Sequence, residues 1–166
     1  MVLRMSRPKG RLAMSRRLRI GLVGCGNFGK ELGRYFLEVA DIVALCDLHP
    51  ERTAETAKAL GLDVPRFTDY RKMFSSCSMD AVVVTAANFA HAEITVAAAG
   101  AGLHVFCEKP MARTIPECWE MVRACRRNGV KLMVGHKRRL RPPWRRMVEL
   151  TDDSLLGRVL TVTVTE

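Results

Sequence analysis

A glycine-rich segment between an apolar run and a helical pattern limits the fold of this chain more than any other feature. The segment is Gly24-Cys25-Gly26-Asn27-Phe28-Gly29, and the apolar run before it is Leu18–Val23. Short apolar runs that end at glycines are typical of buried parallel strands. The apolar residues after the segment recur at helical spacing: Leu32, Tyr35, Phe36 and Val39. The sequence therefore predicts a strand, a tight turn and a helix, in that order.

The same alternation of apolar strands and helices continues to about residue 135. Further strands are predicted at residues 42–47, 65–68, 81–84, 103–107 and 130–134. Helices are predicted at residues 50–60, 70–74, 89–99 and 116–128. Strands that alternate with helices form a parallel sheet covered on both faces, with right-handed crossovers. The predicted class is therefore α/β, a doubly wound parallel Rossmann sheet.

Composition divides the chain into three predicted parts. Residues 1–17 are rich in arginine, contain no acid and are expected to form a basic, disordered extension. Residues 18–135 are expected to form the Rossmann domain. Residues 136–166 are expected to form a basic linker and the first strand of a second, truncated α+β domain, because residues 158–165 alternate as a strand does. A strand without neighbours cannot satisfy both edges, so we expect its partner strands to lie outside this chain.

The glycine segment has the spacing and the context of a dinucleotide-binding turn. It follows a predicted strand, opens a predicted helix and precedes an acid, Asp47, at the end of the next strand. Gly24 permits the tight turn, Gly26 lets the backbone approach a pyrophosphate, and Gly29 lets helix and strand pack closely. The first helical residues, Asn27 and Phe28, bring amide groups and a partial positive charge to the phosphates.

The cofactor predicted from this pattern is NAD. Asp47 is placed to accept hydrogen bonds from the adenosine ribose, and its charge disfavours the extra phosphate of NADP. An alternative is that Asp47 only caps the helix that begins at Pro50, and nearby Arg52 would tolerate NADP. NADP therefore stays open as a second cofactor.

The formal net charge of +10 comes from two clusters of cations. The first is Arg4, Arg7, Lys9, Arg11, Arg16, Arg17 and Arg19, and the second is Lys137, Arg138, Arg139, Arg141, Arg145 and Arg146. Such clusters can bind nucleic acid, but neither alternates with aromatic residues that would stack on bases. We expect the two clusters to form a solvated extension and a patch on the cofactor side. Nucleic-acid binding is the third hypothesis, after an oxidoreductase and a non-catalytic nucleotide-binding module.

Two later segments complete a recognisable order of motifs. They are Asn88-Phe89-Ala90-His91 and Gly102-Leu103-His104-Val105-Phe106-Cys107-Glu108-Lys109-Pro110. Together with the glycine segment and Asp47, they resemble the glucose-fructose oxidoreductase/inositol dehydrogenase (Gfo/Idh/MocA) family over residues 18–135. This chain departs from the family at Ala86-Ala87, where relatives commonly have Thr-Pro.

The resemblance implies roles for individual residues. It implies that Lys109 is the catalytic residue, which moves or stabilises the proton that accompanies hydride transfer, and that the Lys109–Pro110 bond is cis. It implies that Asn88 and His91 flank the nicotinamide and its ribose, that Glu108 lines the same cleft, and that Arg138 faces the cofactor or substrate. Without the resemblance these would be a solvated lysine, a helix cap, a packed or surface histidine and part of a basic linker.

The function predicted is an NAD-dependent oxidoreductase that transfers a hydride between nicotinamide and a sugar, polyol or related secondary alcohol. The chain alone is expected to turn over poorly, and a full-length form to be a homo-oligomer. The alternative is a non-catalytic nucleotide-binding or redox-sensing module. No metal site is expected. The six cysteines form no CxxC pair and no apolar stretch reaches roughly 18 residues, so a cytoplasmic protein without a membrane span is expected.

Overall fold

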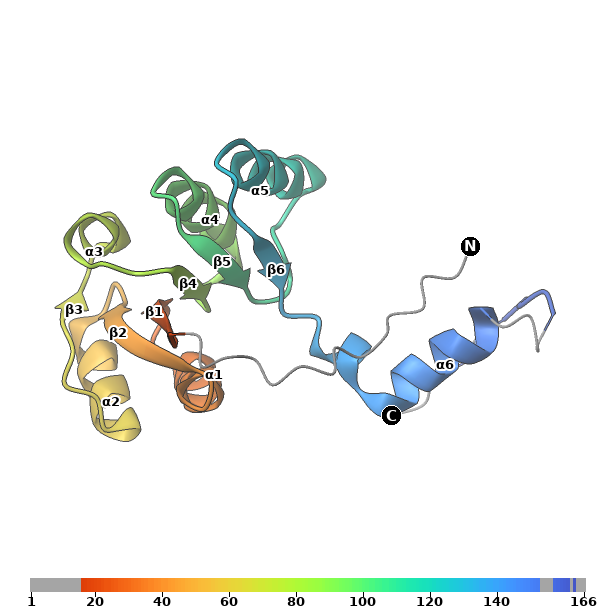
Figure 1. The fold of residues 1–166 in the computed structure, drawn as a ribbon, viewed down its shortest axis with the longest axis horizontal. Coiled ribbons are helices and arrows are strands. Elements are labelled where there is room, and N and C mark those ends of the chain that lie inside the picture. Colours follow the sequence, from red (N-terminus) through yellow and green to blue (C-terminus); the bar gives the residue numbers. More distant parts are fainter. Residues whose placement is uncertain (1–15, 153–156, 162, 164–166) are drawn as a thin grey trace. The chain divides into compact units, whose positions relative to one another are not determined.

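The computed structural model describes residues 16–152, 157–161 and 163. The strands are β1 (Leu18–Val23), β2 (Ala40–Cys46), β3 (Arg66–Phe67), β4 (Ala81–Val84), β5 (His104–Cys107) and β6 (Leu132–Val134). The α-helices are α1 (Asn27–Leu37), α2 (Pro50–Leu60), α3 (Tyr70–Ser76), α4 (His91–Gly100), α5 (Ile115–Arg127) and α6 (Pro142–Asp152). Two 3-10 turns, η1 (Asn88–Ala90) and η2 (Lys137–Leu140), precede α4 and α6 (Figure 1).

The strands form one sheet in the order β3-β2-β1-β4-β5-β6. The pairs β1–β2, β2–β3 and β5–β6 are parallel. This is the strand order of a doubly wound dinucleotide-binding sheet, in which the order reverses at β1 and β4. The predicted fold class is confirmed. Two compact units divide the chain inside β4, the first ending at Val82 and the second beginning at Val83.

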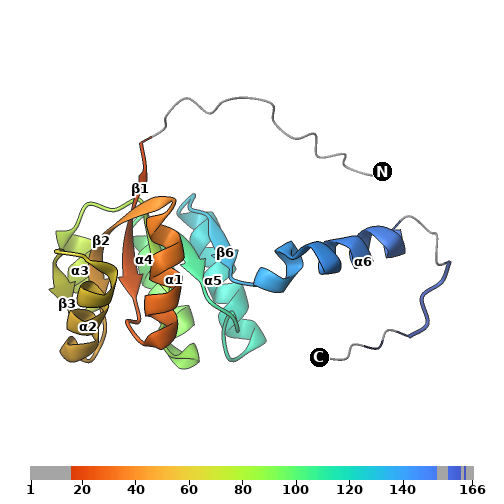
Figure 2. The ribbon, with the colours of Figure 1, turned by 90° about the horizontal axis from the view of Figure 1, so that it is seen from below.

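The first unit places α1 and α2 on one face of β1–β3 and α3 on the other (Figure 1). Figure 2 shows β1 leading through the glycine turn into α1. The core on these strands consists of buried apolar side chains such as Ile20, Leu22 and Leu45. Pro50 begins α2, where its missing N–H costs nothing, and Gly61 ends it at a φ of 64°. Local sequence chemistry therefore sets both ends of α2.

The second unit packs α4 and α5 side by side over β5 and β6 (Figure 1). Their contact is built from small residues, Ala99 of α4 with Ala124 and Cys125 of α5. A capping box begins α5, because the Thr114 hydroxyl accepts from the Glu117 amide while the Glu117 carboxylate accepts from the Thr114 amide. The alanine-rich sequence of α4 thus serves close helix packing.

The helix predicted after the glycine segment is α1, but its packed face is not the one that the large apolar residues mark. Tyr35 is 60% exposed and Val39 lies beyond the end of the helix, whereas Gly29 and Gly33 are its buried residues. A Cβ added at Gly33 would lie 2.7 Å from the Leu60 Cδ1 of α2, so the two helices meet where side chains are smallest. Helical spacing of large apolar residues is a weaker guide than close packing at glycine.

Two other boundaries differ from the prediction. The helix expected at 89–99 begins as η1 and becomes α-helical only at His91. The strand expected at 158–165 is not formed at residues 158–161 and 163, and its remaining residues lie outside the described ones. Leu160 is 81% exposed. A strand needs a neighbour to accept its backbone hydrogen bonds, and the described part of the chain provides none for this segment.

Two residues assigned to the basic extension belong to the fold. Arg16 forms an ion pair with Asp80. Arg17 binds Asp41 and donates to the carbonyl groups of Leu37 and Ala40. These carbonyls lie at the end of α1 and the start of β2, where a cation is favourable. The extension expected at 1–17 otherwise lies outside the described residues.

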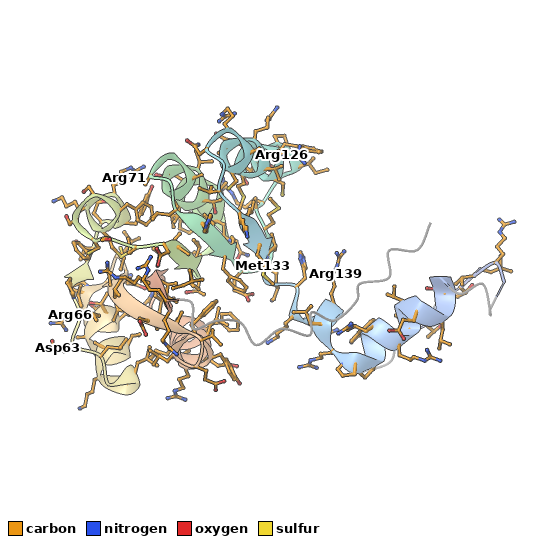
Figure 3. All side chains as sticks on the ribbon, viewed as in Figure 1. Asp63, Arg66, Arg71, Arg126, Met133 and Arg139 are labelled. Atoms are coloured by element: carbon orange, nitrogen blue, oxygen red, sulfur yellow. The ribbon has the colours of Figure 1, made fainter. Side chains whose placement is uncertain are left out.

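Exposed side chains cover the outer surfaces of both units. Examples labelled in Figure 3 are Asp63 and Arg66 in the first unit and Arg126 and Met133 in the second. Within the described ranges, no helix has the length and apolar character needed to cross a membrane.

The cysteines differ sharply in burial, and this predicts their reactivity. Burial raises the pKa of the Cys25, Cys46 and Cys107 thiols to about 12, so these thiols stay protonated at mildly alkaline pH. Only the thiolate is nucleophilic. Cys77 and Cys118 are half-buried.

We expect iodoacetamide to label Cys77 and Cys118 in the native protein, and to label Cys25, Cys46 and Cys107 only after unfolding. Peptide mass spectrometry of native and denatured samples measures this. Rapid native labelling of Cys25 would contradict the buried glycine turn.

Candidate functional site

The glycine turn between β1 and α1 is held by backbone hydrogen bonds. Gly24 has a φ of 99°, which an L side chain rarely adopts, and its N–H donates to the Cys46 carbonyl of β2 at 2.8 Å. The next residue donates its N–H to Asp47, and its carbonyl accepts from the buried Thr56 hydroxyl at 3.0 Å. Thr56 was not predicted from the sequence. A polar residue on the buried face of α2 is the signal that could have identified it.

Neither the backbone conformation nor the packing of the protein requires glycine at position 26. Its φ of −71° and ψ of −173° are open to any residue. A Cβ added there would meet no described atom within 4 Å. Gly26 is also the N-cap of α1 and supplies no side-chain cap, so the helix start presents backbone only. The space in front of this residue is therefore left open beside a helix N-terminus, the arrangement that binds anions.

The other predicted residues of this turn are placed as expected for a helix start. Asn27 and Phe28 are the first helical residues and are exposed, while Gly29 is buried. The Lys30 amide donates to the Gly26 carbonyl at 2.9 Å and closes the first helical turn. The predicted segment thus runs from the buried Gly24 through an exposed helix start to the buried Gly29.

Asp47 follows β2 and is only 9% exposed. Its Oδ2 accepts from the Cys25 amide at 2.8 Å, and its Oδ1 accepts from the His49 amide at 3.0 Å. The Arg52 guanidinium lies 3.8 Å from Oδ1. Asp47 is not the N-cap of α2, because that position is His49. The carboxylate offers about four lone-pair positions, so it ties the glycine turn and keeps capacity for further donors.

Glu108 and Lys109 follow β5 in the second unit. The Glu108 amide donates to the Val84 carbonyl of β4 at 2.9 Å, and its carboxylate accepts from the Lys109 amide at 3.0 Å. Glu108 is 6% exposed, whereas Lys109 is exposed. The Lys109–Pro110 bond is cis, as the resemblance implied. A buried carboxylate and an exposed ammonium thus follow the same strand.

Gly135 makes room for the Glu108 carboxylate. Its amide donates to the Cys107 carbonyl at 2.9 Å, which fixes it next to the end of β5. A Cβ added there would lie 2.9 Å from the Cδ of Glu108 and closer still to Oε1. Gly135 was not predicted as a site residue from the sequence, and a glycine directly after a strand was the available signal.

His91 is enclosed by protein and does not stand at the surface. It is 1% exposed, with Nδ1 2.9 Å from the Pro110 carbonyl and Nε2 2.9 Å from the Ala86 carbonyl. Both ring nitrogens therefore face backbone oxygens. The packed histidine named as an alternative is what the structure shows, and its contact with nicotinamide stays a prediction.

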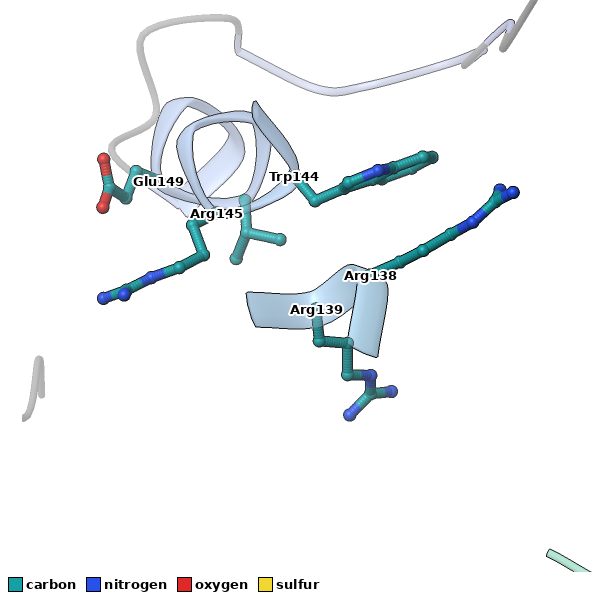
Figure 4. A pocket seen from close by; sticks show the side chains of 6 residues that line it. Arg138, Arg139, Trp144, Arg145 and Glu149 are labelled. Atoms are coloured by element: carbon teal, nitrogen blue, oxygen red, sulfur yellow. The ribbon is translucent and has the colours of Figure 1, made fainter. Parts of the chain in front are cut away.

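Asn88 and Arg138 lie on the two 3-10 turns. Asn88 is exposed and is not a cap, because Ala87 is the N-cap of η1 and Ala90 that of α4. The Arg138 guanidinium lies over the Trp144 ring, 6.0 Å from its centroid (Figure 4).

The cavity between η2 and α6 has a volume of about 590 Å³. Its lining residues are Arg138, Arg139, Trp144, Arg145, Val148 and Glu149. The predicted cofactor contact of Arg138 stays a prediction.

Comparison with known proteins identifies relatives of the whole described core. Residues 18–136 match the GFO_IDH_MocA family, described as an oxidoreductase family with an NAD-binding Rossmann fold. A 2,7-anhydro-N-acetylneuraminate hydratase of Mediterraneibacter gnavus is 40% identical, over 84% of this chain and 37% of its own. An inositol 2-dehydrogenase/D-chiro-inositol 3-dehydrogenase of Lactiplantibacillus plantarum is 33% identical, over 86% of this chain and 42% of its own.

Solved structures agree with the sequence comparison. The WlbA dehydrogenase of Bordetella pertussis, solved with NADH and UDP-GlcNAcA, has a TM-score of 0.79 and 30% identity. The match covers 86% of this chain and 44% of that one. The chain spans less than half the length of these relatives. On the match over residues 18–136 and the fold that those residues adopt, this chain belongs to the Gfo/Idh/MocA oxidoreductase family.

Proposed function

We propose that this chain binds NAD and forms the cofactor-binding part of an oxidoreductase that acts on a secondary alcohol of a sugar or polyol. The pyrophosphate would lie against the amide groups from Gly26 to Gly29 at the start of α1, and Asp47 would bind the adenosine ribose. When bound, the cofactor supplies the hydride acceptor or donor. The chain's own residues position it and manage the accompanying proton.

The observation that carries the proposal is the open space in front of Gly26. Neither backbone conformation nor packing requires glycine at this position, whereas a ligand against the backbone does. The neighbouring Cys25 amide is already bound to Asp47, so the turn is fixed before any ligand arrives. A preformed site avoids the entropy cost of ordering a loop on binding. Membership of a family described as NAD-binding supports the same cofactor.

Lys109 is proposed to handle the proton at the substrate oxygen. It is the exposed cation beside a buried carboxylate, at the carboxyl end of β5. Open α/β sheets bind ligands outside the carboxyl ends of their strands. An ammonium there can donate to a carbonyl oxygen as hydride arrives, or accept the alcohol proton through its neutral form. Asn88 and Glu108 are proposed to contact the nicotinamide half of the cofactor, and Arg138 the cofactor or substrate.

The substrate class rests on the named relatives, and two outcomes are open. An inositol dehydrogenase is among them, which supports net oxidation of a polyol. A hydratase of an anhydro sugar acid is also among them, which supports a conversion without net formation of NADH. Product analysis with catalytic NAD separates the two. Cytoplasmic location and homo-oligomer formation stay predictions, and a non-catalytic nucleotide-binding module is the remaining alternative.

Replacing Gly26 with alanine tests the cofactor site directly. We expect Gly26→Ala to weaken NADH binding by about tenfold or more, because the methyl group fills the space next to the pyrophosphate. We expect the thermal midpoint to change little, since the restriction of the unfolded chain by alanine is offset by the loss of a better N-cap residue. Calorimetric titration and thermal unfolding measure both.

Gly100→Ala is the matched control, because Gly100 also meets nothing within 4 Å. It should leave NADH affinity unchanged and keep or slightly raise the thermal midpoint, since alanine is also the better helix former at the end of α4. Unaltered NADH affinity in Gly26→Ala would remove the proposed pyrophosphate site.

Asp47→Asn is expected to act on stability and on cofactor choice together. The amide cannot accept at both positions, so we expect a loss of about 1–3 kcal/mol in the free energy of unfolding. We also expect NAD affinity to fall and the preference for NAD over NADP to narrow, since a negative charge next to Arg52 is removed. Denaturant unfolding and titration with both cofactors measure this. Asp63→Asn, at an exposed acid, should leave both unchanged.

Lys109→Ala separates catalysis from cofactor binding. In the intact protein acting on its preferred substrate, we expect turnover to fall by about 100-fold or more, while NAD affinity stays within experimental error. Steady-state kinetics and cofactor titration measure the two. The matched control is Lys131→Ala, since Lys131 is exposed and uses only its backbone in its hydrogen bonds. Full turnover in Lys109→Ala would refute the catalytic assignment.

A further inference from the structure

His91 makes two hydrogen bonds that a neutral imidazole cannot make at once. Each ring nitrogen lies 2.9 Å from a backbone carbonyl oxygen, Nδ1 from Pro110 and Nε2 from Ala86. A carbonyl oxygen only accepts, so each contact needs an N–H on the ring. A neutral imidazole has a single N–H, and its second nitrogen would direct a lone pair at an oxygen lone pair. The geometry is satisfied only when both nitrogens carry protons.

The contacts place this ring between the two segments that carry the nicotinamide-side residues of the proposed site. Ala86 follows β4 and precedes Asn88, and Pro110 follows Lys109 after β5. The ring is 1% exposed, so water cannot replace either contact. One side chain on α4 therefore joins both segments through their backbones.

Charged groups of both signs lie on the elements around this ring. The titratable groups are Glu93 of α4, His104 and Cys107 of β5, Glu108 and Lys109 after β5, and, on α5, which packs against α4, Glu117, Cys118, Glu120, Arg123, Cys125, Arg126 and Arg127. Glu108 is buried and Glu93 is exposed. Burial raises the pKa of Cys107 to about 12, so that thiol carries no charge at neutral pH. Over these elements four carboxylates balance four lysine and arginine side chains, so the protonation state of the ring is inferred from its two hydrogen bonds.

We propose that His91 is a positioning residue held as an imidazolium, whose two N–H groups fix the Asn88 segment to the Lys109 segment. The protonation state follows from the contacts alone. The positioning role rests on the proposed function, because it concerns how those two residues are presented to the nicotinamide. This differs from a direct contact between His91 and the cofactor.

His104 provides an internal comparison. Its Nδ1 accepts a hydrogen bond from the Lys131 amide at 3.1 Å, so that nitrogen carries no proton. The two histidines, on α4 and β5, are therefore expected to have opposite states at neutral pH: both ring nitrogens protonated in His91, and Nδ1 unprotonated in His104. The contrast can be measured in one sample.

Nitrogen-15 NMR of the imidazole side chains of the wild-type chain at neutral pH tests the protonation state. We expect two directly bonded protons on the His91 ring and an unprotonated Nδ1 on His104. The signals are assigned by their loss in His91→Gln and His104→Gln. One unprotonated nitrogen in His91 overturns the proposal. If His91→Gln folds poorly, the His91 signals are identified as those left after His49→Gln, His104→Gln and His136→Gln, since the chain has four histidines.

The positioning role has its own readout. In His91→Gln, which is neutral and can donate from one nitrogen only, we expect the largest backbone amide shifts at Ala87 and Met111, whose peptide groups contain the two accepting carbonyls, with smaller shifts at Asn88 and Lys109. We also expect about tenfold weaker NADH binding. His104→Gln should change neither. Unchanged amide shifts and unchanged affinity in His91→Gln overturn the positioning role. Failure of the wild-type chain to bind NADH would refute the proposed function and leave the spectrum of His91 as a separate result.

Discussion

The first unit depends on the contact between the Asp47 carboxylate and the Cys25 amide. Asp47 is buried, and burying a carboxylate is costly unless donors compensate its charge. The amides of Cys25 and His49 provide that compensation, so the glycine turn and the start of α2 form around one charge. The same residue that selects a ribose would then also shape the surface for the pyrophosphate. Asp47 would thus serve both ribose recognition and the geometry of the glycine turn.

In the second unit, the proposed His91 imidazolium has a similar role to that of the Asp47 carboxylate, with the opposite charge. His91 joins the segments after β4 and β5 through backbone carbonyls, as Asp47 joins its two segments through backbone amides. In each unit a buried ionisable side chain organises main-chain groups. Of the residues proposed to contact ligand, Asn88 and Lys109 are exposed, whereas Asp47 and Glu108 are buried.

The sequence predicted the fold well because strand and helix patterns alternate clearly from Leu18 to Val134. The ends of α2 were also predictable, since Pro50 and Gly61 act locally. Long-range packing was not: the buried face of α1 is set by the approach of α2 to Gly33, which periodicity cannot show. Within the candidate site, the glycine turn, Asp47 and Lys109 were found by spacing or resemblance. Thr56 and Gly135 were missed, because each acts only through a residue distant in sequence.

The Glu108 carboxylate and any side chain at position 135 would need the same space, so substitutions at the two positions are expected to be coupled. The Cβ of any other residue at 135 would lie 2.9 Å from the Glu108 Cδ and 3.2 Å from the Phe106 Cζ, so a larger residue there requires the Glu108 carboxylate to move. Exchange of Glu108 for a shorter side chain would release that restriction. We therefore expect relatives to retain the acid and the glycine together or to lose them together, a coupling that an alignment would register as paired substitution between positions 27 residues apart.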